Sequence, residues 1–90
     1  TLSLHDALPI LLDIEYSLII ETTEEPDFFT FFSPDLEGFT GVGHSIEDCI
    51  YNARHAMRDH VKLLIENRLP VPPKNEDPKI IIQNSFKIAA

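Results

Sequence analysis

The side chains that could do acid, base or metal chemistry are thinly spread along this 90-residue chain. A metal-dependent hydrolase needs several carboxylates that converge on one or two ions. Glu47 and Asp48 are adjacent, so on a helix they would diverge by about 100°. Glu15 and Glu21 would share one face of a strand but lie far apart along it. The pattern predicts no catalytic carboxylate site, and we expect no enzymatic activity.

The histidines and the single cysteine form no ligand set or nucleophile pair. His55 and His60 are five residues apart, which would point them about 140° away from each other on a helix. No His-x-x-x-His or paired Cys/His spacing occurs in the sequence. Cys49 falls on an apolar stripe, where a thiol packs as a small apolar group. We therefore expect no metal, no cofactor and no disulfide within the chain.

The net charge indicates which class of partner this protein can bind. Seven Lys and Arg residues stand against 15 Asp and Glu residues, for a net charge of −8. Binding to a phosphate backbone needs a basic face, so direct contact with nucleic acid is not expected. A basic protein partner suits this surface better, although acidity also serves solubility. No apolar run approaches the roughly 20 residues of a membrane span, and one cysteine gives no sign of an oxidising compartment, so a cytoplasmic protein is expected.

Five short segments have the sequence patterns of strands or of the turns between them. Residues 14–20 alternate between apolar and polar positions, which predicts a strand with one buried face. Residues 22–27 are polar and contain proline, as in a hairpin connection, and residues 28–32 are strongly β-prone. Residues 34–38 predict a turn and residues 39–42 a short return strand.

One long helix follows these strands. Ser45 is a natural N-cap, and Asp48 stands three residues on, where the acid of a capping box belongs. Apolar residues then recur every three or four positions from Ile46 to Leu69, and Pro70 ends the helix. After an extended proline-rich stretch, residues 79–83 predict a last strand. The fold class is therefore α+β, with the order β-β-β-α-β, a mainly antiparallel sheet and one long helix on one face.

The phenylalanines of the second strand fall on both of its faces. Phe28 and Phe32 share one face, and Phe29 and Phe31 share the other. One face must meet the helix. The other either lies under a loop or the N-terminal segment, or forms a surface for a partner.

The chain holds one domain. Residues 1–11 lack an initiator Met and a basic region, so we interpret them as a non-native or disordered leader. Residues 12–90 form the domain.

The turn and the helix start together resemble the signature of the HicB antitoxin family. That family shows a Pro-Asp-Leu-x-Gly turn, a glycine five residues beyond it, a small hydroxyl residue that opens the helix, an acidic pair, and a Pro-x-Pro segment after the helix. The resemblance covers residues 14–83. The matching residues are Pro34, Asp35, Leu36 and Gly38, then Gly43, Ser45, Glu47 and Asp48, then Pro70 and Pro72.

This resemblance implies a partial RNase H-like sheet without the nuclease's catalytic carboxylates. It also implies an antitoxin that forms a homodimer and covers the active site of a HicA-type toxin, a small basic ribonuclease that cleaves mRNA. Phe32, Asp35 and Glu37 are the candidate toxin-contact residues. The alternative is structural: Phe32 belongs to the core and Asp35 caps its own turn.

Two departures from the family pattern leave other functions open. Glu37 stands where the family favours proline, which loosens the turn. Many HicB proteins also carry a C-terminal DNA-binding domain, which has no counterpart up to Ala90. The alternatives are therefore a transcriptional autorepressor fragment without its DNA-binding domain, or an orphan HicB-like domain for oligomerisation or ligand binding.

Overall fold

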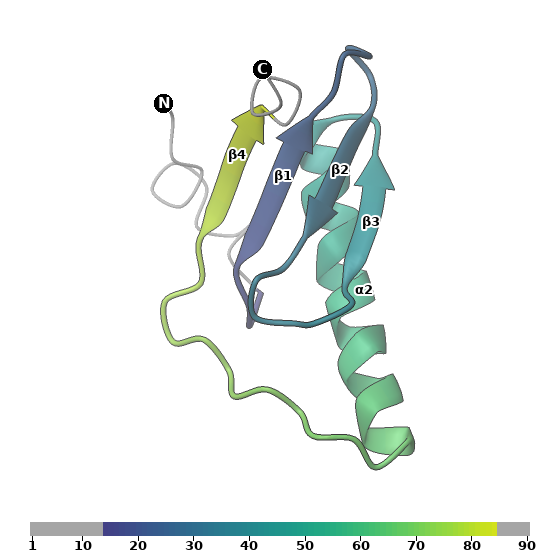
Figure 1. The fold of residues 1–90 in the computed structure, drawn as a ribbon, viewed down its shortest axis with the longest axis vertical. Coiled ribbons are helices and arrows are strands. Elements are labelled where there is room, and N and C mark those ends of the chain that lie inside the picture. Colours follow the sequence, from purple (N-terminus) through teal and green to yellow (C-terminus); the bar gives the residue numbers. More distant parts are fainter. Residues whose placement is uncertain (1–13, 85–90) are drawn as a thin grey trace.

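A computed structural model of the chain describes residues 14–84, which form a four-stranded sheet and one long helix (Figure 1). The sheet order is β3-β2-β1-β4; β1–β2 and β2–β3 are antiparallel, and β4 is parallel to β1. The predicted α+β class and the element order β-β-β-α-β, with one helix, are confirmed for these described residues. The predicted leader, residues 1–11, lies outside the described residues. The elements are β1 (Leu18–Thr22), β2 (Phe29–Phe32), β3 (Thr40–Gly43), α2 (Ile46–Glu66) and β4 (Ile80–Asn84).

The first strand begins four residues later than the predicted Ile14. Its alternation nevertheless holds, because Ile14, Tyr16, Leu18 and Ile20 are all at most 6% exposed. The backbone before Leu18 bonds to loop atoms instead of a neighbouring strand. The Glu15 carbonyl, for example, accepts a hydrogen bond from the Asn75 N–H at 2.8 Å. Hydrophobic periodicity therefore predicted which residues are buried but not where the ladder starts.

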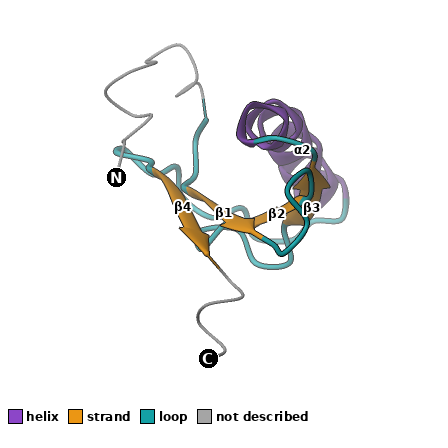
Figure 2. Cartoon of the chain, turned by 90° about the horizontal axis from the view of Figure 1, so that it is seen from above, coloured by secondary structure: helices purple, strands orange, loops and turns teal. Residues whose placement is uncertain are grey.

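The helix lies on one face of the sheet, where two glycines allow close packing (Figure 2). A Cβ built on Gly43 would lie 2.7 Å from Cys49 Sγ, and one on Gly41 would lie 2.3 Å from the Phe31 ring. Cys49 is fully buried in the core. The glycines of β3 thus let α2 and an aromatic ring lie directly on the strand.

The C-terminal part of α2 runs past the sheet, which differs from the predicted continuous buried stripe (Figure 1). The last fully packed residue of that stripe is Met57, whereas Ile65 is 62% exposed and Leu69 is 53% exposed. A helix of 21 residues is about 30 Å long, but strands of four or five residues span only about 15 Å. The sheet is too short to cover the whole apolar stripe.

The predicted N-cap of α2 is confirmed. Ser45 Oγ accepts a hydrogen bond from the Asp48 N–H at 3.0 Å. The Asp48 carboxylate reaches back to the His44 N–H at 2.9 Å, one residue before the position that a capping box uses. Asp48 and Glu47 also place negative charge in the first turn, where the helix dipole favours it.

Replacing Ser45 with alanine should destabilise the protein by about 1 kcal/mol, because the Asp48 N–H loses its acceptor. For a domain of this size, that loss corresponds to a fall in melting temperature of roughly 4–8 °C. Ser45→Asp is the matched control, since its carboxylate can accept the same hydrogen bond. Thermal unfolding by circular dichroism measures both. Equal melting temperatures for Ser45→Ala and the wild type would show that the cap contributes nothing.

Candidate protein-binding surface

The face of the sheet that points away from α2 has an apolar centre. Ile19 pairs with Phe32 on one side and with Ile81 on the other, so these three side chains form a row across three strands. Within residues 14–84 no helix covers this face (Figure 2). Val42 and Ile81 are 54% and 46% exposed. We call this the outer face; it comprises Ile19, Glu21, Thr30, Phe32, Thr40, Val42, Ile81 and Gln83.

The half of the domain that builds most of this face carries only negative charge. Residues 14–53 contain nine Asp and Glu residues and no Lys or Arg. Glu21 lies on the outer face itself, where its carboxylate accepts a hydrogen bond from Gln83 Nε2 at 3.0 Å. Glu24 and Glu25 are exposed in the β1–β2 connection. An apolar strip is thus set within acidic surroundings.

The loop between β2 and β3 is held by its own apolar residues. Leu36 and Phe39 are 1% and 4% exposed, so they anchor the loop in the core. The Phe39 N–H donates to the Leu36 carbonyl at 3.3 Å, and Gly38 has a φ of 80°. A positive φ at the third of four residues is the mark of a type II turn, which favours glycine there. Glu37 is consequently held exposed at the second turn position.

Asp35 ties this loop to two distant segments. Its Oδ2 accepts hydrogen bonds from the Ser17 N–H at 2.8 Å and from Asn75 Nδ2 at 3.0 Å. Asn75 Nδ2 also donates to Ser17 Oγ at 3.1 Å, and Ser17 Oγ accepts the Lys79 N–H at 3.0 Å. This Ser17–Asp35–Asn75 cluster joins the approach to β1, the β2–β3 loop and the segment before β4.

The hydrogen bonds lower the pKa of Asp35. The backbone N–H of Ser17 is the largest cause and the Asn75 side chain the next, while partial burial opposes them. Both hydrogen bonds favour the ionised carboxylate. Its acceptor oxygen, Oδ2, is occupied by donors within the protein. The prediction that Asp35 caps its own turn is wrong, because its carboxylate accepts hydrogen bonds from residues 18 and 40 positions away in the sequence.

The structure places the three candidate contact residues in different environments. Phe32 is half-buried on the outer face and lies outside the core cluster, so the core alternative for it is wrong. Glu37 is exposed at the turn, and Asp35 has the structural role described above. Contact with a partner stays a prediction for all three. Among the residues of the predicted motif, Leu36 is in the core, Gly38 makes the turn, and Gly43, Ser45 and Asp48 form the entry to α2.

Sequence reasoning missed Ile19 and Ile81 as members of the outer face. A signal existed, because Ile19 interrupts an otherwise regular alternation with an apolar residue on the polar face. Ile81 is the middle residue of an all-apolar triplet, which must place at least one isoleucine on the outer face.

Two kinds of reactive site can be checked in the described residues: a metal-ligand cluster and a reactive thiol. In the described part of the chain, no three His, Cys, Asp or Glu side chains lie close enough to hold a metal ion. Burial raises the pKa of Cys49 to about 11, with the Asp48 carboxylate as the second cause. The thiol therefore remains protonated at neutral pH, as expected for a core residue.

No protein-family model, curated protein or solved structure matches this chain. The HicB resemblance and its RNase H-like sheet therefore stay predictions. Among residues 14–84, no helix combines the length and the hydrophobicity that crossing a bilayer requires.

Proposed function

We propose that this protein is an antitoxin that binds and neutralises a small basic HicA-type ribonuclease, with the outer face as the main contact surface. The observation that carries this proposal is the apolar row of Ile19, Phe32 and Ile81, which no helix covers within residues 14–84. Ile19 and Phe32 belong to residues 14–53, which contain no Lys or Arg. A small apolar patch rimmed by charge is typical of a protein-binding site. In this proposal the protein acts in the cytoplasm.

The chemistry of the surface defines the partner. Exposed carboxylates such as Glu37 attract a cationic enzyme and compete with RNA phosphates for its basic face. The apolar row then supplies the buried contact that holds the complex, since aromatic anchors contribute most of the affinity in many interfaces. The order of the signature residues, from Pro34 through Gly43 to Ser45, supports the HicB type of antitoxin among proteins of this kind.

The proposal is tested with a HicA-type ribonuclease encoded by an adjacent gene. We expect the purified chain to bind this enzyme in calorimetry and to inhibit its cleavage of RNA at equimolar concentration. Association should slow as salt is raised, because long-range attraction between opposite charges is screened. If the two proteins show no heat of binding and cleavage continues, the antitoxin proposal fails for that pair.

Phe32→Arg should reduce the affinity for the ribonuclease about 100-fold, because it removes an aromatic anchor and places a cation opposite a basic partner. Leu63→Arg is the control: it introduces the same cation at an apolar residue that is exposed on α2 and does not belong to the outer face. Isothermal titration calorimetry compares the two, with circular dichroism to confirm that both variants fold. Tight binding by Phe32→Arg would exclude the outer face as the contact surface.

A further inference from the structure

The part of α2 that extends past the sheet presents an apolar surface (Figure 1). We call residues 58–66, the last turns of this helix, the overhang. Leu63 and Ile65 are 56% and 62% exposed there, and Val61 and Leu64 are half-buried. These four side chains spread over roughly 200° of the helix circumference, which is wider than the apolar stripe of an ordinary surface helix. The overhang is therefore more apolar than a solvated helix end requires.

The overhang and the outer face have matching lengths. The helix of 21 residues exceeds the strands of four or five residues by about 15 Å. The strands that carry the apolar row of Ile19, Phe32 and Ile81 are themselves about 15 Å long. Within residues 14–84, one molecule thus has an apolar helix segment that lies beyond its sheet and an apolar sheet face that no helix covers.

The charges around the two surfaces are opposite in sign. Residues 58–68, the overhang and the turn after it, hold three cations and two anions. Residues 14–53, which supply most of the outer face, hold nine anions and no Lys or Arg. Complementary charge of this kind favours contact between the overhang of one molecule and the outer face of another. Two outer faces placed together would instead bring like charges into contact.

We propose that two copies of this chain form a dimer in which the overhang of each lies on the outer face of the other. Two-fold symmetry makes the two contacts identical and closes the assembly, because each copy supplies one surface of each kind. Each sheet then has its own α2 on one face and the overhang of its partner on the other. The contacts remove the apolar row and the exposed side chains of Leu63 and Ile65 from water, which stabilises the dimer.

This dimer also has a consequence for the regulation of the outer face. A second copy and a ribonuclease would occupy the same surface, so each would exclude the other, and this consequence rests on the proposed function. The dimer itself does not, because it forms from this chain alone. Its test needs no ribonuclease, and its failure would leave the antitoxin proposal unchanged.

Sedimentation velocity of the purified full chain measures the dimer. We expect a reversible monomer–dimer equilibrium with a Kd on the order of 10 µM, as for an interface of modest size. Ile65→Glu should weaken the dimer about tenfold or more, because it removes an apolar contact and places a carboxylate against an acidic face. Tyr51→Glu is the matched control, since it introduces the same charge at a large residue of α2 that is 58% exposed and precedes the overhang.

Two results of this measurement would overturn the proposal. One is a wild-type chain that stays monomeric up to about 1 mM, a concentration far above the expected Kd. The other is equal weakening by Ile65→Glu and Tyr51→Glu, which would indicate a general effect of added charge. Circular dichroism confirms that the variants fold, and Leu63→Glu replaces Ile65→Glu in the comparison if that variant does not.

A mixing experiment distinguishes this dimer from one that joins two like surfaces. Phe32→Arg alters only the outer face and Ile65→Glu alters only the overhang, so each variant alone should dimerise poorly. Mixed in equal amounts, they should associate about tenfold more tightly than either variant alone, because the intact overhang of one meets the intact outer face of the other. A fluorescent label on one variant makes the mixed dimer visible in sedimentation. Wild-type dimerisation by either single variant, or no association in the mixture, would show that the proposed contact is wrong.

Discussion

Replacing Gly43 with valine should destabilise the protein by about 3 kcal/mol or more and lower its melting temperature by more than about 10 °C. Among the glycines only Gly38 has a positive φ, so valine at position 43 would not strain the backbone in that way. The expected loss at Gly43 is therefore steric. A Cβ at Gly43 would lie 2.7 Å from Cys49 Sγ and 2.9 Å from the Cys49 backbone nitrogen. Valine adds two further methyl groups to a Cβ that already has no room. Thermal and denaturant unfolding measure the loss.

The helix cannot move away from this clash at low cost. Cys49 is in the first turns of α2, where the Ser45 side chain and the Asp48 carboxylate hold the helix start against the end of β3. Moving α2 outward would also open the core around fully buried Ile50 and Ala53. Both β3 and α2 would therefore have to shift to make room for the valine side chain.

Gly38→Ala is the matched control for this prediction. A Cβ at Gly38 meets no atom within 4 Å, but the residue has a φ of 80°. Alanine there should cost only about 1–2 kcal/mol of left-handed strain. Combining Gly43→Ala with Cys49→Ala should recover part of the loss, since the Sγ contact disappears. Wild-type stability in Gly43→Val would show that the two elements are not packed as the structure has them.

Local signals predicted most of the secondary structure. The alternation of residues 14–20, the phenylalanines of β2 and the Ser45 cap each depend on neighbours within a few residues, which a sequence displays directly. The division of the β2 phenylalanines between two faces was predicted for the same reason, from strand parity. Which face meets the helix was not predicted; the structure places Phe31 in the core and Phe32 outside it.

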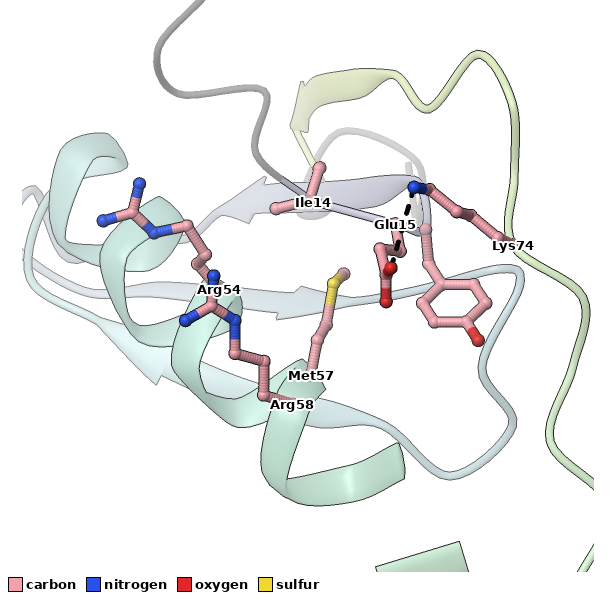
Figure 3. A pocket seen from close by; sticks show the side chains of 7 residues that line it. Ile14, Glu15, Arg54, Met57, Arg58 and Lys74 are labelled. Atoms are coloured by element: carbon pink, nitrogen blue, oxygen red, sulfur yellow. Dashed lines mark ion pairs between the residues drawn. The ribbon is translucent and has the colours of Figure 1, made fainter. Parts of the chain in front are cut away.

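Long-range features could not be predicted in the same way. No local pattern shows that β4 lies parallel beside β1, because that position depends on how the connection after α2 returns along the sheet. The bond between Asp35 and Asn75 joins residues 40 positions apart, and its geometry exists only after folding. The pocket that Arg54, Arg58 and Lys74 line was not predicted, because its residues come from α2, from the approach to β1 and from the connection after α2, which meet only in the folded chain (Figure 3).

The helix end was also misplaced by local reasoning. Pro70 suggested that α2 continues to Leu69, but the helix ends at Glu66. Arg68 takes a φ of 57°, its N–H donates to the Ile65 carbonyl, and the Leu69 N–H donates to the Leu64 carbonyl. This is the Schellman motif, in which the residue in the left-handed conformation is usually glycine. With arginine there, the sequence carries no such signal.

Asp35→Ala should destabilise the protein by about 2–4 kcal/mol at neutral pH. The change removes two hydrogen bonds to an ionised acceptor, each of which contributes about 1.5–3 kcal/mol, partly offset by water that reaches the half-buried site. The Ser17 N–H is left without its acceptor in a residue only 9% exposed. Since Asp35 joins the β2–β3 loop to Ser17 and Asn75, the loop that carries Glu37 should also loosen. Denaturant unfolding measures the stability, and hydrogen exchange of the Ser17 N–H measures the local effect.

The effect of Asp35→Ala should depend on pH in a defined direction. The pKa of Asp35 is lower in the folded protein than its ordinary value of 3.8, so the ionised carboxylate stabilises the fold. That stabilisation is complete above the ordinary pKa and is lost as the pH falls through the lower, folded value. The difference in unfolding free energy between wild type and variant should therefore be constant at neutral pH and shrink below about pH 4.

Two control variants separate the contributions of charge and of the acceptor. Asp35→Asn keeps an acceptor oxygen but loses the charge, so it should lose about half as much stability as Asp35→Ala. The unfolding free energy of this variant should also lack the pH dependence that the Asp35 carboxylate contributes below about pH 4. Glu37→Ala, in the same loop but exposed, should change stability by less than about 0.5 kcal/mol. A stability difference that does not shrink in acid would show that Asp35 acts by packing and not through its carboxylate. A loss no larger than that of Glu37→Ala would show that the cluster does not hold the loop at all.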